Sequence, residues 1–388
     1  MAEQPLHAVN RRHLEELTGD LGIWQHASGT VPDRGFGTCT DDVARALTVD
    51  LLHARELGWE PVRHSAWRSL RLLRDAWSPT GARFRNVRSA DGAWLDAAGT
   101  EDTQGRGVLA LGLALAEPLE PAFAADTLML FANALPTARR LGSLRAIASC
   151  IVGCTAALTG DVLHQELRGV TSAALRDITG RLRDAFPTGD AAAEWPWPEP
   201  ILAYENAILP RALMVAGSWL GDTEAAGLGL RVLEWLTVVQ RTASGGYSPI
   251  GNRGWWRRDG TRARFDQQPI EAASQLLACE AAYALASDAH WLASAERAYG
   301  WFLGDNDSRL PVADPATGGC HDGLEPTRVN LNQGAESTLM WLTALEHMRA
   351  LRRAGSVPAT DRTTDQRPDT APTSPAAPAT TAARQPGG

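Results

Sequence analysis

Residues 101–117 read EDTQGRGVLALGLALAE, and this stretch decides the fold. Its second half, GVLALGLALA, is apolar around the whole circumference of a helix, so the helix that it predicts must be buried on most sides. Polar residues, EDTQ, stand directly before the apolar part. The stretch is therefore typical of an inner helix whose first turn meets a polar environment.

The same arrangement recurs along the chain. A polar, often acidic cluster precedes an alanine- and leucine-rich stretch six times, and matching stretches without a cluster lie between them. The clusters begin near residues 40, 101, 141, 204, 266 and 332, and the one at 141–143 is the weakest. The spacing, about 55 to 60 residues, lacks the regular sequence repetition of a solenoid. The sequence therefore predicts an all-α fold, an (α/α)6 toroid of about six helical hairpins with long loops.

In such a toroid the six clusters lie at one end of one ring of helices, where they can converge on a pocket. Residues 1–354 are predicted to form this single domain, and residues 355–388, rich in Pro, Thr and Ala, a disordered tail. Asp91-Gly92 within the alternating stretch 82–95 predicts a small β-hairpin at one mouth of the toroid. The Gly-rich residues 29–37 are interpreted as a loop that leads into the first inner helix.

Composition excludes several classes of partner. The net charge of −8 argues against nucleic acid and against an anionic membrane, because both require a basic surface. No apolar run approaches the roughly 18 residues of a membrane span, and no signal peptide is recognised, so a cytoplasmic protein is expected. The five cysteines lack a paired metal-type spacing, and no metal or other cofactor is predicted.

The acidic clusters have a simple interpretation as helix caps, because carboxylates are favoured in the first turn of a helix. Capping needs one side chain, whereas these segments add arginines and amides such as Arg45, Gln104, Arg106 and Gln268. Such a surplus of donors and acceptors suits a hydroxyl-rich ligand. Trp residues in loops, including Trp255 and Trp256, can stack on sugar rings or simply pack on the core.

Several stretches together resemble a bacterial family of six-hairpin glycosidase-like proteins whose members are often labelled glycosyltransferases. They are GTCTDDVARAL, EDTQGRGVLALG, EWPWPEPILAYENAILPRAL, GNRGWW, FDQQPIEA, GGCHDGL and NQGAESTL, and the resemblance extends from about residue 14 to 351. The resemblance implies the toroid, a carbohydrate ligand and a possible glycosyltransferase partner. A nucleotide-sugar transferase of the common kind is not expected, because no G-x-G-x-x-G follows a buried strand.

Carboxylates at the mouth of a toroid favour glycoside hydrolysis, which needs one acid and one base or nucleophile. Inversion is expected, since carboxylates on different helices easily reach the separation of about 6.5 to 9.5 Å that it requires. The candidate catalytic residues are Asp41, Asp42, Glu101, Asp102, Asp266 and Glu271. The candidate substrate-binding residues are Arg45, Gln104, Arg106, Trp195, Trp197, Glu205, Asn206, Trp255, Gln267, Gln268, His321, Asp322, Asn332, Gln333 and Glu336.

Other functions remain open on sequence grounds. A non-catalytic glycan-binding protein, or a companion of a glycosyltransferase, would keep the Trp and amide residues without needing paired acids. A glycoside phosphorylase would need a basic subsite, which could be supplied by Arg253, Arg257, Arg258, Arg262 and Arg264. An epimerase would use His as acid and base. Terpenoid cyclase and zinc chemistry are less favoured, because the D-x-D-D acid and a third metal ligand beside Cys320-His321 are missing.

Overall fold

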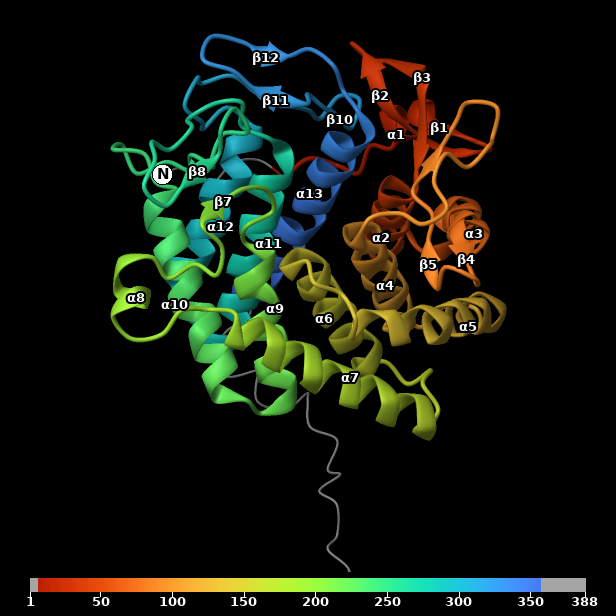
Figure 1. The fold of residues 1–388 in the computed structure, drawn as a ribbon. Coiled ribbons are helices and arrows are strands. Elements are labelled where there is room, and N and C mark those ends of the chain that lie inside the picture. Colours follow the sequence, from red (N-terminus) through yellow and green to blue (C-terminus); the bar gives the residue numbers. More distant parts are fainter. Residues whose placement is uncertain (1–5, 357–388) are drawn as a thin grey trace, which may run out of the picture.

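The computed structural model describes residues 6–356, and Figure 1 shows them as a ring of helices with loops and short strands at one end. The predicted tail, residues 355–388, lies outside the described part except for its first two residues, which end the last helix. None of the helices within residues 6–356 combines the length and the apolarity needed to cross a bilayer.

Six inner helices form a closed ring, in which each contacts the next and the last returns to the first. They are α2 (Thr40–Leu57), α4 (Glu101–Leu115), α6 (Leu144–Thr159), α9 (Ile208–Leu220), α11 (Pro269–Ala286) and α13 (Ala335–Ser356). Because the ring is closed, its apolar inner surfaces cover one another and no end of the array is exposed. The toroid that the sequence predicts is confirmed.

An outer layer pairs with the inner ring. The outer helices are α1 (Arg12–Leu17), α3 (Trp59–Ala76), α5 (Pro121–Ala138), α7 (Gln165–Asp184), α10 (Thr223–Val239) and α12 (Ala289–Phe302). Each packs on the inner helix beside it in sequence, except that α1 packs on α13 and so joins the two ends of the chain. A further short helix, α8 (Asp190–Glu194), lies in the loop before α9 and has no buried residue.

Small residues allow two inner helices to approach closely. A Cβ atom on Gly112 of α4 would lie 2.0 Å from the carbonyl oxygen of Gly153 on α6. Gly112 is therefore required by helix packing, although glycine weakens a helix intrinsically.

The main β structure is one that the sequence did not predict. β2 (Gly22–Ser28) and β3 (Val31–Cys39) form an antiparallel hairpin, in which Trp24 pairs with Thr38 and a bulge precedes His26. The interpretation of residues 29–37 as a loop is therefore wrong, because their glycines and proline conceal the alternation of a strand. β1 (Thr18–Gly19) and β6 (Val87–Arg88) complete the sheet, in the order β1-β2-β3-β6.

The remaining strands are two-residue pairs in the loops. They are β4 (Trp77–Ser78) with β5 (Arg83–Phe84), β7 (Ile201–Leu202) with β8 (Trp256–Arg257), β9 (Ala313–Asp314) with β10 (Gly319–Cys320), and β11 (Gly323–Leu324) with β12 (Val329–Asn330). The hairpin expected at 82–95 is reduced to β6 and a single bridge between Arg88 and Trp94. Figure 1 shows β2, β3, β11 and β12 at the top of the molecule, where the loops gather.

Candidate functional site

A pocket opens where the first turns of the inner helices meet, at the end of the ring that carries the loops. It encloses about 300 Å³ and is bordered by residues of α2, α4, α11 and α13 and of the loops between them. We call it the mouth pocket. Its lining residues are Asp41, Arg45, Asn86, Thr100, Asp102, Arg106, Tyr204, Asn252, Trp255, Gln268, Ile270 and Glu336.

Two buried arginines form the floor of the mouth pocket. Arg45 donates to Asp42 Oδ1 at 2.8 Å and to Glu336 Oε2 at 2.5 Å, so it joins α2 to α13. Arg106 donates to Glu205 Oε2 at 2.8 Å, which joins α4 to the loop before α9. Each guanidinium is thus held by a carboxylate from another part of the chain, and the paired charges fix the floor.

Asp42 binds Arg45 in this floor and is not among the residues that line the pocket. It is 4% exposed, and Cys39 Sγ lies 3.1 Å from its second oxygen. Burial raises the pKa of Asp42, against the opposing effect of the Arg45 guanidinium.

Asp102 lies where three segments of the chain meet. Ser143 Oγ at the start of α6 donates to its Oδ1 at 2.9 Å, and the Tyr204 hydroxyl donates to its Oδ2. Burial, followed by this hydrogen bond to Asp102, raises the pKa of Tyr204. Both oxygens of Asp102 therefore act as acceptors at the edge of the pocket.

Asp41 borders the mouth pocket, and one of its oxygens has no partner within residues 6–356. Asn86 Nδ2 donates to Asp41 Oδ2 at 3.2 Å, and the Asp41 amide donates back to Asn86 Oδ1 at 3.3 Å. Asp41 Oδ1 is buried and accepts no hydrogen bond from any residue within 6–356. An unpaired buried oxygen is costly, so Asp41 is held in place at the expense of one hydrogen bond.

Glu271 lies beneath the pocket and holds the loop 204–206. It accepts the backbone N–H of Glu205 and, at 3.3 Å, Asn206 Nδ2. Glu205 has a φ of 47°, a left-handed conformation that a non-glycine residue adopts at a cost of about 1 kcal/mol or more. Burial raises the pKa of Glu271 to about 7. Glu271 thus supports Glu205, which in turn holds Arg106.

Seven of the sequence-predicted residues line the mouth pocket: Asp41, Arg45, Asp102, Arg106, Trp255, Gln268 and Glu336. Four more, Asp42, Glu205, Asn206 and Glu271, form the layer directly below it. The structure therefore brings together residues from five of the six clusters.

Three other predicted residues have structural contacts instead. Glu101 accepts the backbone N–H groups of residues 142 and 143, at 2.7 and 2.6 Å, and so caps α6. Gln104 is fully buried and bonds the backbone of Phe84 and Ala134. Gln267 is also fully buried and bonds Asp307 at 2.6 Å. The polar groups of these three side chains bind other parts of the fold, and none of the three residues lines the pocket.

A further group of predicted residues supports the loops beside the mouth. Asp322 Oδ1 accepts the Gly334 amide at 2.8 Å, and Asn332 Oδ1 accepts the Gly29 amide at 3.1 Å. The main chain of Gln333 donates to Gly29 at 2.9 Å, and His321 Nδ1 lies 3.3 Å from a backbone oxygen. These contacts order the rim.

Asp266 is half-buried, and burial raises its pKa. Its main-chain oxygen accepts the amide of Asn252, which itself lines the mouth pocket. Asp266 therefore lies beside the pocket without being among its lining residues.

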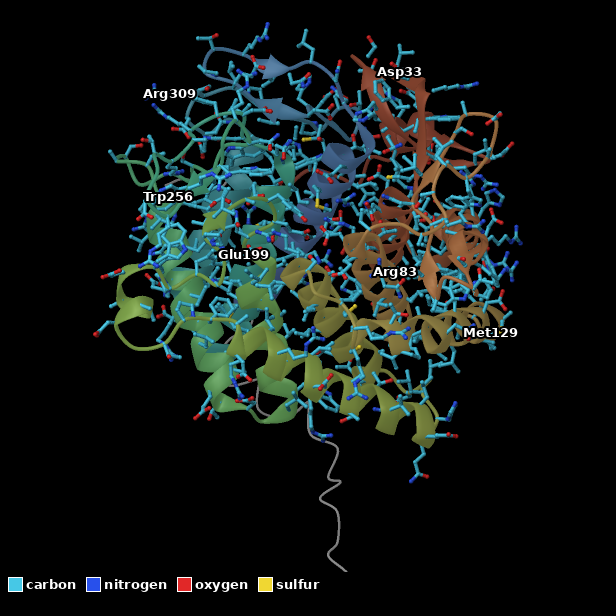
Figure 2. The ribbon with its side chains drawn as sticks, viewed as in Figure 1. Asp33, Arg83, Met129, Glu199, Trp256 and Arg309 are labelled. Atoms are coloured by element: carbon cyan, nitrogen blue, oxygen red, sulfur yellow. The ribbon has the colours of Figure 1, made fainter. Side chains whose placement is uncertain are left out.

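Trp195 and Trp197 belong to an aromatic cluster in the outer layer. Trp195 meets Trp235 and Trp256 edge to face, at centroid distances of 5.4 and 5.2 Å, and Trp197 stacks on Trp235 at 6.4 Å. Trp256 is labelled in Figure 2 at the outer side of the molecule, near α10. Of the Trp residues expected at sugar subsites, Trp255 borders the mouth pocket, whereas Trp195 and Trp197 pack in the aromatic cluster.

Sequence reasoning did not select Asn86, Thr100, Tyr204 or Asn252 as site residues. Tyr204 stands directly before Glu205 in a cluster, which is a signal that could have identified it. Asn86 and Asn252 lie in loops whose course depends on β-pairing. Their positions in the sequence therefore do not indicate that they reach the pocket. No group of three or more His, Cys, Asp or Glu side chains within residues 6–356 is arranged to hold a metal ion.

The fold and the pocket together define an α/α toroid with a carboxylate- and arginine-lined mouth. No protein-family profile matches the chain, and no curated protein matches its sequence. Solved structures with the same fold include a D-mannose isomerase, with a TM-score of 0.64 and 11% identity over 88% of this chain and 96% of that one.

Two further structures are similar to the same degree. The cellobiose 2-epimerase from Bacillus thermoamylovorans has a TM-score of 0.66 and 11% identity, over 88% of this chain and 98% of that one. The GH76 alpha-mannanase from Bacteroides thetaiotaomicron has a TM-score of 0.64 and 11% identity, over 89% and 95%. The names of these proteins denote enzymes that act on sugars. Likeness at this identity establishes the toroid and leaves the reaction to the site.

Proposed function

We propose that this protein is a carbohydrate-active enzyme that binds a glycan in the mouth pocket and hydrolyses one of its glycosidic bonds. The observation that carries the proposal is the convergence of Asp41, Asp102 and Glu336, from three inner helices, around one pocket. Glycoside hydrolysis requires an acid and a base or nucleophile on either side of the scissile bond. The sugar-active enzymes that share the fold support the same substrate class.

In this proposal Asp102 is the base or nucleophile and Asp41 the general acid. Asp102 accepts from the hydroxyls of Ser143 and Tyr204, so it is held as an acceptor in a fixed orientation. Asp41 borders the pocket on another inner helix, so its carboxyl is placed to give a proton to the leaving oxygen of a substrate. Glu336 is engaged by Arg45 and helps to orient the sugar.

Trp255 and Gln268 are proposed to hold the sugar ring. Trp255 is partly exposed and borders the mouth pocket, so its indole can meet a ligand there. An indole face suits the apolar face of a pyranose, and an amide suits its hydroxyls. The surplus of acidic groups around the pocket favours a neutral substrate over an acidic one.

A panel of α- and β-linked oligosaccharides, with and without phosphate, tests the proposal when wild type is compared with Asp41→Asn and Asp102→Asn. We expect turnover of at least one glycan in the wild type and a loss of about 100-fold or more in each variant. Glu166→Gln, which changes an exposed carboxylate on α7, is the matched control and should keep full activity. Inversion remains the predicted stereochemistry, and the first-formed anomer seen by proton NMR decides it.

Other outcomes of the panel distinguish the alternatives. Glycan binding without turnover, retained in both variants, would favour a binding or glycosyltransferase-companion role. Turnover that depends on phosphate would favour a phosphorylase. A change of a free sugar without bond cleavage would favour isomerase or epimerase chemistry, which the likeness to D-mannose isomerase and cellobiose 2-epimerase raises as a second candidate. Against it, no His lies among the mouth-pocket residues within 6–356.

A further inference from the structure

A second, separate cavity lies along the axis of the toroid beneath the floor of the mouth pocket. It encloses about 100 Å³, and Arg45 and Arg106 form its upper end. Its wall is mostly apolar and includes Leu51, Leu277 and Met340 from three inner helices. We call it the axial cavity. A cavity of this order has room for a small molecule, since an engineered cavity of about 150 Å³ binds one.

The axial cavity reaches the surface at the end opposite the mouth. Arg55 near the end of α2 borders the cavity and pairs with Glu117 just beyond α4. The Arg55 side chain is 53% exposed. A ligand therefore has a route into the cavity that avoids the mouth pocket.

Among the arginines that line the axial cavity, Arg211 stands apart. Arg45, Arg55 and Arg106 are each paired with a carboxylate. Arg211 on α9 makes no side-chain hydrogen bond or ion pair with any residue of the described part of the chain. A guanidinium carries five N–H donors, and Arg211 is only partly buried, so its donors are available to a ligand in the cavity.

The nearby acidic groups do not supply that partner. Glu280, the carboxylate with the largest influence on Arg211, accepts from His347 Nδ1 at 2.6 Å, and His347 also borders the cavity. Glu205, the next, is paired with Arg106. Burial lowers the pKa of Arg211 against the attraction of these two carboxylates.

We propose that the axial cavity binds a short-chain aliphatic monocarboxylate, with the carboxylate on Arg211 and the alkyl chain against Leu277 and Met340. The unpaired guanidinium matches a carboxylate in charge and in its forked geometry. The apolar wall matches an alkyl chain, and the volume limits that chain to a few carbons. This inference is independent of the proposed reaction at the mouth.

Isothermal titration with hexanoate, 1-hexanol and hexylamine tests the site in the wild-type protein. The three probes share an alkyl chain and differ in the charge of the head group. We expect saturable binding of hexanoate, weaker binding of hexanol by about tenfold or more, and no binding of hexylamine. Absence of saturable hexanoate binding, or equal affinity for hexanoate and hexylamine, would overturn the proposal.

Variants locate the binding. Arg211→Met should reduce the affinity for hexanoate to that for hexanol, and Leu277→Trp should abolish both by filling the cavity. Arg176→Met, which removes an exposed arginine from α7, is the matched control and should bind like the wild type. Hexanoate binding that Arg211→Met leaves unchanged would refute the site. If Arg211→Met does not fold, the comparison of the three probes on the wild type still decides.

Discussion

Replacement of Glu271 by Gln should alter the pH dependence of stability in a defined way. Glu271 is 4% exposed, and burial raises its pKa from an ordinary value of 4.5 to about 7. In the unfolded chain the carboxyl loses its proton near pH 4.5, whereas in the folded protein it keeps the proton to about pH 7. Between these values the folded state binds more protons, so the stability of the wild type falls as the pH rises through this window and then levels off.

The size of this loss of stability follows from the shift in the pKa of Glu271. A displacement from 4.5 to about 7 corresponds to about 3 kcal/mol of lost stability between pH 4.5 and pH 8. Because glutamine does not titrate, the Glu271→Gln variant should not lose stability in this way as the pH rises. Glutamine also offers one acceptor where Glu271 supplies two, to the Glu205 amide and to Asn206, so about 1–3 kcal/mol should be lost at every pH.

The stability difference between wild type and Glu271→Gln should therefore change with pH. The variant should be less stable by about 1–3 kcal/mol near pH 5 and should match or exceed the wild type near pH 8. Urea unfolding followed by circular dichroism at several pH values measures the difference. Glu166→Gln is the control, since its exposed carboxylate should leave the pH profile unchanged. Parallel pH profiles for wild type and Glu271→Gln would show that burial does not hold the proton on this group.

Three further predictions concern packing, capping and the two kinds of Trp. Gly112→Ala should lower the free energy of unfolding by about 2 kcal/mol, because its Cβ would collide with the backbone of α6, whereas Gly169→Ala, with open space around its Cβ, should raise it by about 1 kcal/mol. Equal effects in thermal unfolding would contradict this packing. Glu101→Ala should cost about 1 kcal/mol through the lost cap of α6 while leaving turnover intact; a collapse of turnover in the folded variant would return Glu101 to the active site. Trp195→Ala should destabilise by about 3–5 kcal/mol, and Trp255→Ala should instead raise KM about fivefold with little change in Tm; the reverse pattern would exchange their roles.

The fold was readable from the sequence because its determinants are local and repeated. A run such as GVLALGLALA can be stable only if it is covered on all sides, and six such runs alternating with amphipathic partners are best covered by a closed ring. The β2–β3 hairpin was missed for the opposite reason. Its residues 29–37 contain three glycines and a proline, and the strand is stabilised by pairing with β2 and β6, which the local sequence does not reveal.

The sequence predicts which polar clusters form the site. It does not predict how far along the axis of the ring each side chain lies. The sequence indicates which helices carry polar first turns, and most of these turns do meet. It does not indicate whether a given side chain ends in the pocket, in the floor or against a neighbour. Gln104 and Gln268 both belong to polar clusters, yet Gln104 is fully buried against backbone and Gln268 lines the mouth.

Adjacent carboxylates in these clusters divide two tasks between them, and helix geometry gives the reason. Neighbouring residues on a helix point about 100° apart, so when one side chain faces the axis of the ring, the next faces an adjoining element. Asp41 borders the pocket while Asp42 binds Arg45 in the floor, and Asp102 borders the pocket while Glu101 caps α6. In each pair one carboxylate borders the pocket and the other holds a neighbouring element in place. Substitution of the member that borders the pocket, Asp41 or Asp102, should therefore affect binding and turnover more than substitution of its neighbour.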